Sequence, residues 1–251
     1  MPRSTAFEPP YTLSEWLKFH CIPARLYTRY LVNKNLRRGE VELHVLPQIV
    51  PASRVAVDVG ANKGVYTHLL ATLASHVHAF EPNPKAFRWL NRSLPTNVTT
   101  HQLALSDRDG DSLLYIPKRR NGYSNQHSSM REVTATMPHV ALPIKSRTLD
   151  SCAFTNVGFI KIDVEGFEAE VLAGAHRTIH QSKPILLIEI EEQHTGRRLE
   201  DSIAEVISLG YCGHFVDGTT LRSLTEFDPE RRHRMPEHPS DYVFNFIFIP
   251  D

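Results

Sequence analysis

Apolar positions along the chain alternate between short continuous runs and helical spacing. Residues 55–59 read VAVDV, an apolar β-branched run typical of a central parallel strand that is covered on both faces. After Gly60 and Gly64, the apolar positions between Val65 and Leu73 recur at helical spacing. The pattern predicts a strand, a tight turn and a helix, which is the first unit of a nucleotide-type α/β fold.

Further apolar runs continue the alternation of strands and helices. Four of them are strand candidates: HVHAFEP (76–82), VTTHQLAL (98–105), VGFIKIDV (157–164) and PILLIEIE (184–191). Two more, GYCGHFVDG (210–218) and YVFNFIFIP (242–250), leave no room for a long crossover helix between them, so the last strand can insert antiparallel. The order predicts a mostly parallel sheet with helices on both faces.

Two regions lie outside this pattern. Residues 12–50 have a helical pattern with breaks at Pro23 and Pro47, so residues 1–50 are expected to form an N-terminal helical extension packed on a core domain of residues 51–251. A polar stretch at 118–138 interrupts the apolar runs. Long polar loops in compact domains often act as lids or binding loops, and a floppy insertion is the alternative.

Composition narrows the class of protein. The 251 residues contain 28 Lys and Arg and 28 Asp and Glu, so no general field draws the chain to nucleic acid or to an anionic membrane. No apolar run approaches the roughly 18–20 residues of a membrane span, and the N-terminus lacks the apolar core of a signal peptide. The three cysteines are odd in number and far apart. We therefore expect a globular protein of the reducing cytoplasm.

The first turn indicates which ligand the fold binds. A dinucleotide site needs G-x-G-x-x-G, but Asn62 stands at the middle glycine position, and Asp58 would repel a pyrophosphate. An acid there suits an ammonium group. Glu81 ends the second strand, 21 residues after Gly60, where a carboxylate can accept hydrogen bonds from both ribose hydroxyls. Ammonium, ribose and no phosphate describe S-adenosylmethionine; the alternative is an ordinary α/β turn with an incidental acid.

Several motifs resemble those of the FkbM-type methyltransferases, which use S-adenosylmethionine. They are VDVGANKGVYT, AFEPNP, ALSDRDG, TLD (148–150), FIKIDVEGFEAEVLAGA and PILLIEI, and together they cover roughly residues 40–250. The resemblance implies a class I, Rossmann-like methyltransferase fold over residues 51–251, with seven strands in the order 3-2-1-4-5-7-6 and strand 7 antiparallel. It also implies methyl transfer to a hydroxyl oxygen, typically in the tailoring of glycans or natural products.

The resemblance also assigns cofactor-binding residues. It places the methionine end of the cofactor on Asp58, Gly60, Ala61, Asn62, Gly64 and Thr67. It places the ribose on Glu81, and the adenine against Pro82, Asn83, Ala104 and Leu105.

The chemistry of methyl transfer needs a group that activates the acceptor hydroxyl. The base candidates are Asp163, Glu165, Glu191 and His194. We favour Asp163, which follows a strand at the carboxyl edge of the sheet and can instead orient the cofactor, with His194 in reserve. The alternative for Glu165 is a cap on the helix that starts near Gly166.

Two points about charged groups remain open in the sequence. Lys161 lies within a central strand, so it needs a carboxylate partner, which we expect to be Glu189 or Asp58 on the neighbouring strands. A cation site built from Asp163 with Glu189 or Glu191 is an alternative, but we expect a metal-free enzyme.

Other functions remain as alternatives. A cofactor-binding scaffold without catalysis would share the fold. A nucleic-acid or N-methyltransferase is a weaker alternative: EPPY (8–11) is similar to a motif of amino-methyltransferases but follows no apolar strand, and no basic aromatic stripe is present. The expected acceptor is a small molecule or a glycan.

Overall fold

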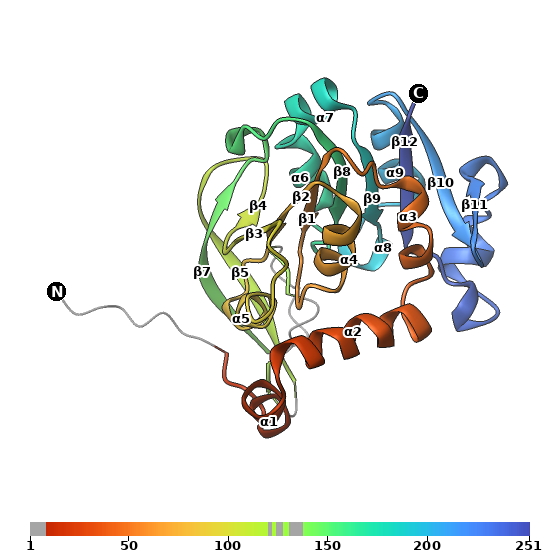
Figure 1. Ribbon diagram of the computed structural model, residues 1–251. Helices are drawn as coiled ribbons and strands as arrows, with labels where there is room; N and C mark the ends of the chain where they lie inside the picture. The colour runs from red at the N-terminus through yellow and green to blue at the C-terminus, as the bar shows by residue number, and fades with distance from the viewer. Residues whose placement is uncertain (1–8, 120–121, 124–127, 131–137) are drawn as a thin grey trace.

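The fold is built on a central, mostly parallel sheet. The structure, a computed structural model, describes residues 9–119, 122–123, 128–130 and 138–251 (Figure 1). In these residues the sheet has the order β11-β10-β12-β9-β8-β1-β2-β3. Its strands are β1 (Val55–Val59), β2 (His76–Phe80), β3 (Val98–His101), β8 (Val157–Ile162), β9 (Ile185–Glu189), β10 (Tyr211–Asp217), β11 (Thr220–Ser223) and β12 (Asn245–Pro250).

Strand directions confirm the predicted class of fold. Strands β3, β2, β1, β8 and β9 pair in parallel, and β12 inserts antiparallel between β9 and β10. This is the expected order 3-2-1-4-5-7-6, to which β11 adds an eighth strand at the edge. The expectation of seven strands was wrong, because β10 and β11 form a hairpin that was not predicted. Gly218 has φ +63°, so the chain turns directly after β10 and β11 pairs back on it.

Helices cover both faces of the sheet, as the alternation of elements predicted (Figure 1). On one face the core joins Val57 and Ile160 to α6 (Glu168–Ala173), α7 (His176–Ser182) and α9 (Leu199–Ile207). On the other face, Ala56 and Phe159 pack with α3 (Leu46–Ile49) and α4 (Val65–Leu73). Because side chains alternate along a strand, Asp58 and Lys161 lie on the α4 side, paired in register across β1 and β8.

A second, smaller sheet is inserted between β3 and β8. Its order is β4-β7-β5-β6, with β4 (Ala104–Leu105), β5 (Gly110–Arg119), β6 (Gly122–Tyr123) and β7 (His139–Arg147). The run 98–105, predicted as one strand, is therefore two, because β4 leaves the central sheet to pair with β7. Within the polar stretch 118–138, residues 120–121, 124–127 and 131–137 lie outside the described residues.

The N-terminal region is helical up to β1. It comprises α1 (Leu13–Cys21), α2 (Ala24–Arg38), a 3-10 turn at Val41–His44, and α3. Pro23 precedes α2 as predicted, whereas Pro47 stands in the first turn of α3 and does not break it, since proline is tolerated there. None of the described helices is both long and apolar enough to span a bilayer.

The remaining helical elements lie beside the strands of the central sheet. They are α5 (Pro84–Leu90), which follows β2, α8 (Glu192–Thr195), which follows β9, and short turns at Asp150–Cys152, Leu224–Glu226, Glu230–Arg234 and Pro239–Asp241.

Candidate active site

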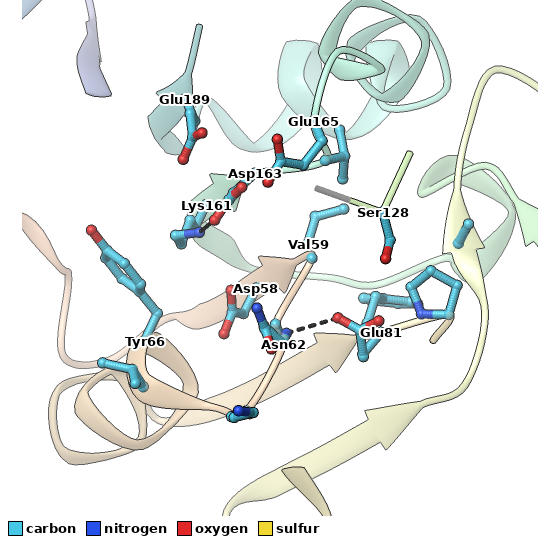
Figure 2. A pocket seen from close by; sticks show the side chains of 18 of the residues that line it. Asp58, Val59, Asn62, Tyr66, Glu81, Ser128, Lys161, Asp163, Glu165 and Glu189 are labelled. Atoms are coloured by element: carbon cyan, nitrogen blue, oxygen red, sulfur yellow. Dashed lines mark hydrogen bonds and ion pairs between the residues drawn. The ribbon is translucent and has the colours of Figure 1, made fainter. Parts of the chain in front are cut away.

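A cavity of about 660 Å³ opens at the carboxyl ends of the central strands (Figure 2). Residues that end or follow β1, β2, β8 and β9 form its floor, among them Asp58, Glu81, Asp163 and Glu189. Open α/β sheets bind their ligands at this edge. The location is therefore the one that the sequence analysis assigned to the cofactor.

The turn after β1 brings the backbone close to the end of β8. Gly60 has φ +82°, and a Cβ atom there would lie 1.8 Å from the carbonyl oxygen of Asp163. Only glycine fits this position. Asn62 also has a positive φ, +48°, a conformation that asparagine tolerates better than most residues. Gly60, Ala61 and Asn62 line the cavity as a consequence.

Asp58 is fully buried and faces the cavity. Its Oδ2 accepts a 2.6 Å hydrogen bond from the hydroxyl of Thr67, whereas its buried Oδ1 has no hydrogen-bond partner among the described residues. Burial raises the pKa of this carboxyl group, although Lys161 and Thr67 act in the opposite direction. An unsatisfied buried acceptor is costly, so Oδ1 is positioned to accept from a ligand donor such as an ammonium group.

Glu81 connects the turns after β1 and β2. Its Oε2 accepts from the backbone N–H of Asn62 at 2.8 Å (Figure 2). Its Oε1 accepts from the backbone N–H of Asn83 at 2.7 Å. The carboxylate is thereby held at the cavity wall with lone pairs left for further donors. Burial raises its pKa to about 7.

Lys161 pairs with Asp163 and not with the expected partners. Its Nζ lies 2.7 Å from Oδ2 of Asp163 and 4.4 Å from the ring centroid of Tyr66. The lysine is buried, as predicted, but no direct ion pair joins it to Glu189 or Asp58. The prediction considered partners only across neighbouring strands, whereas residues two apart project to the same side of an extended chain and can meet directly.

Glu165 and His194 form a second pair beside the cavity. Oε2 of Glu165 lies 3.1 Å from Nδ1 of His194, and Nε2 of this histidine lies 4.0 Å from Oε2 of Glu191. Glu165 does not cap the following helix, since its φ is +56° and α6 begins only at Glu168. Instead Glu168 accepts from the N–H of Gly166 at 2.9 Å.

Carboxyl groups outnumber cationic groups on this wall. Glu189 lines the cavity near Asp163 and Glu165 (Figure 2). Burial and those two neighbouring carboxylates raise the pKa of Glu189 well above its usual value. One ligand atom each of Glu165, Glu189 and His194 lie within 4.8 Å of one another, so these three could also hold a divalent cation. These three residues differ from the cation site considered in the sequence analysis, which was Asp163 with Glu189 or Glu191.

The structure brings most of the predicted site residues to one cavity. Those that line it are Asp58, Gly60, Ala61, Asn62, Glu81, Pro82, Ala104, Leu105, Asp163 and Glu165. Four others lie behind the wall. Thr67 supports Asp58, Asn83 caps α5, Gly64 has φ +84° at the start of α4, and His194 supports Glu165.

Sequence reasoning missed two further parts of the wall. The N-terminal region contributes Glu15, Leu31, Lys34, Asn35 and Glu40, and the inserted sheet and the segment between β6 and β7 contribute Leu114, Tyr123, Ser128 and Met130. Tyr66 was also missed, although it is the second residue of α4 and directly follows the predicted glycine turn; its hydroxyl donates to Oε2 of Glu40 at 2.5 Å. Tyr123, Ser128 and Met130 lie within the polar stretch 118–138, for which a binding loop was one alternative, whereas no local pattern marked Leu114 or the N-terminal residues.

Comparisons with known proteins agree with the fold. The family model described as Methyltransferase FkbM domain matches residues 58–216. Hexuronic acid methyltransferase AglP of Haloferax volcanii is 30% identical over 161 residues, which cover 62% of this chain and 64% of that protein. The chain thus matches less than two thirds of that relative's length.

A solved structure shows the same architecture. The chain is similar to the crystal structure of methyltransferase FkbM from Methylobacillus flagellatus KT, with a TM-score of 0.51 and 18% sequence identity. The match covers 90% of this chain and 55% of that one. At this identity the similarity concerns the fold alone.

Proposed function

Because the chain belongs to the FkbM methyltransferase family, we propose that it transfers the methyl group of S-adenosylmethionine to a hydroxyl oxygen of a sugar-type acceptor. Residues 51–251 form the methyltransferase domain in this proposal, and residues 1–50 are an extension that supplies part of the cavity wall.

The buried, unpartnered Oδ1 of Asp58 is the observation that carries the proposal. It calls for a cationic or hydrogen-bond-donating ligand group beside β1, and the ammonium group of S-adenosylmethionine is one. Glu81 offers acceptors for ribose hydroxyls at the neighbouring strand end. A pyrophosphate fits poorly, because it would meet both carboxylates.

The acidic wall also suits the charge of the cofactor. S-adenosylmethionine carries a sulfonium and an ammonium against one carboxylate, so it is a net cation. Asp58, Asp163 and Glu189 face the space that it would occupy. Placing a cation among crowded carboxylates relieves their mutual repulsion, which strengthens binding.

Each residue of the acceptor side then has a distinct role. When bound, S-adenosylmethionine supplies a methyl group that the acceptor oxygen takes as its own proton leaves. Glu165 lines the cavity with His194 behind it, so this pair receives the proton. Asp163 is held by Lys161 and orients the reacting groups.

A sugar-type acceptor is favoured by two observations. The curated relative is named for a hexuronic acid, a sugar that carries hydroxyl groups and one carboxylate, so the name supports a sugar-type acceptor and not a particular oxygen. The cavity of about 660 Å³ is also polar on its acceptor side, with Lys34, Asn35 and Glu40 available to sugar hydroxyls. Nucleic acid is disfavoured as an acceptor, because its phosphates would meet the carboxylate-rich wall.

Two experiments on the purified protein test the proposal, one of cofactor binding and one of methyl transfer. S-adenosylhomocysteine should stabilise it in a thermal-shift experiment and NAD should not; stabilisation by NAD alone would contradict the choice of cofactor. Incubation with S-adenosylmethionine and a panel of sugars, including hexuronic acids, should then add one methyl group to a hydroxyl, as detected by mass spectrometry. Cofactor binding without transfer to any acceptor would favour the scaffold alternative, and transfer to RNA would contradict the acceptor class.

A further inference from the structure

The first two helices expose an unusual number of large apolar side chains. Of the ten such side chains that the described residues expose, six belong to α1, α2 and the link between them. We call these six the α1–α2 apolar face; they are Leu13, Trp16, Leu17, Ile22, Leu26 and Tyr30. Leu13 is 75% exposed, and Leu26 and Tyr30 are each 59% exposed. Clustering of this kind on one surface indicates an interaction site.

This exposure does not result from a loosely attached helix. The opposite side of α1 packs on α5: Phe19 lies edge-on to Trp89, with ring centroids 4.9 Å apart, and Glu15 pairs with Lys85 at 2.8 Å. Thr12 and Glu15 form a capping box at the start of α1. Arg92 donates to the carbonyl of Ile22 at 2.9 Å. The polar and aromatic contacts therefore fix α1 with its apolar stripe facing outward.

The stripe follows helical spacing. In α1, Leu13, Trp16 and Leu17 stand at positions i, i+3 and i+4, and in α2, Leu26 and Tyr30 stand four residues apart. In Figure 1 the two helices lie along the lower edge of the molecule, away from α7 and α9.

Basic side chains border the α1–α2 apolar face. Residues 13–38 contain six Lys and Arg and one acid, Glu15, which is already paired. The exposed bases outside the cavity wall are Lys18, Arg25, Arg29, Arg37 and Arg38, and none of them forms an ion pair with an acid among the described residues. The zero net charge of the whole chain conceals this local excess. An apolar stripe flanked by unpaired bases is typical of helices that lie on anionic lipid surfaces.

We propose that the α1–α2 apolar face docks on an anionic lipid surface, with Trp16 and its neighbours in the interface and the flanking bases on the lipid phosphates. The long stems of Lys and Arg can lie along the apolar region while their charged ends reach the headgroups. The docking stands independently of the proposed function. A consequence that rests on that function is that α2, which lines the cavity with Leu31, Lys34 and Asn35, brings the active site close to acceptors held at the lipid surface.

Co-sedimentation with vesicles tests the docking. The full chain should bind vesicles of phosphatidylcholine mixed with phosphatidylglycerol, should bind pure phosphatidylcholine weakly, and should bind the mixed vesicles less at high salt. Arg25→Gln combined with Arg29→Gln should weaken binding about tenfold or more. Trp16→Ser combined with Leu17→Ser should weaken binding by a similar or larger factor.

Matched control variants test whether vesicle binding depends on the α1–α2 apolar face or on any exposed apolar or basic side chain. Met235 and Ile207 are exposed apolar residues elsewhere, 74% and 44% exposed, and their serine variants should bind as the original chain does. Arg198→Gln and Arg231→Gln provide the same control for charge. An unchanged melting temperature and unchanged S-adenosylhomocysteine binding show that each variant is folded.

Two results would overturn the proposal. One is the absence of binding to the mixed vesicles, or binding that the α1–α2 variants and the controls share equally. The other is a dimer, seen by light scattering in the original chain and lost in Trp16→Ser with Leu17→Ser, because the face would then cover a second copy of the chain.

Discussion

The ammonium group of Lys161 lies 2.7 Å from the carboxylate of Asp163, two residues further along the same chain segment. The lysine side chain is 3% exposed and that of the aspartate 27%. The buried charge of Lys161 is therefore neutralised by a more accessible carboxylate at the cavity. Burial alone would lower the pKa of Lys161, but Asp163 and Asp58 together hold it above its usual value. The pair therefore keeps a cation inside the sheet and fixes the orientation of Asp163.

Lys161→Met should destabilise the fold by about 3 kcal/mol in urea unfolding, because Asp163 and the fully buried Asp58 lose their shared cation. The matched control is Lys145→Met, which breaks an ion pair with Asp111 whose side chains are 70% and 83% exposed. That change should have little effect on unfolding. Equal losses in the two variants would show that the buried pair is not a stabilising feature.

Glu81→Ala should weaken the binding of S-adenosylhomocysteine by about 1.5–3 kcal/mol in calorimetry, the value of hydrogen bonds to a charged group. Part of this loss comes from the turns after β1 and β2, which Glu81 joins through Asn62 and Asn83. Glu81→Gln preserves the shape and one acceptor, so it should lose less. An unchanged dissociation constant in Glu81→Ala would mean that the ribose does not bind there.

The pH dependence of binding follows from the raised pKa of Glu81, about 7 in the unliganded protein. Ribose hydroxyls donate to the ionised form, so binding should strengthen as pH rises from 6 to 8, by up to about tenfold, with release of a proton. Glu81→Gln should remove this slope, whereas weaker binding at pH 8 than at pH 6 would contradict the assignment.

The raised pKa of Glu81 has the opposite effect on the stability of the unliganded protein, which falls as pH rises. The folded pKa of about 7 lies above the ordinary 4.5, so the folded state holds more protons between these values. The contribution of Glu81 to stability is therefore largest below about pH 4.5 and falls as pH rises to 7.

Glu165→Gln and His194→Ala should each lower turnover by roughly 10²–10⁴-fold while the affinity for S-adenosylhomocysteine is retained, because the pair receives the acceptor proton. Asp163→Asn should mainly weaken cofactor binding. Measuring kcat and the dissociation constant for all three variants separates these roles. A loss of turnover confined to Asp163→Asn would make Asp163 the base.

EDTA should leave turnover unchanged. The proposed proton acceptor is the Glu165–His194 pair, which can take the acceptor proton without a cation. The measurement is the methyl-transfer rate before and after chelation, followed by addition of Mg²⁺. Loss with EDTA and recovery with Mg²⁺ would instead indicate a cation held by Glu165, Glu189 and His194.

The sequence by itself determined the fold class and the part of the cavity that follows β1 and β2. Strand and helix periods are local properties, so the run 55–59, the glycine turn and the helix after it could be predicted from neighbouring residues. The alternation of strands and helices predicted a mostly parallel sheet, whereas the strand order was implied by the resemblance of the motifs to those of the FkbM-type methyltransferases. Asp58 and Glu81 were placed correctly at the sheet edge, since each ends or nearly ends a predicted strand.

Only the tertiary structure decided which side chains meet. The contact of Glu165 with His194, the support of Asp58 by Thr67, and the cavity residues from α2 and the inserted sheet join segments that no local pattern connects. Likewise, whole-chain composition predicted no attraction to an anionic surface, whereas packing of α1 on α5 leaves one apolar face exposed beside unpaired bases. Burial and charge depend on which elements pack together, and that is settled by the fold as a whole.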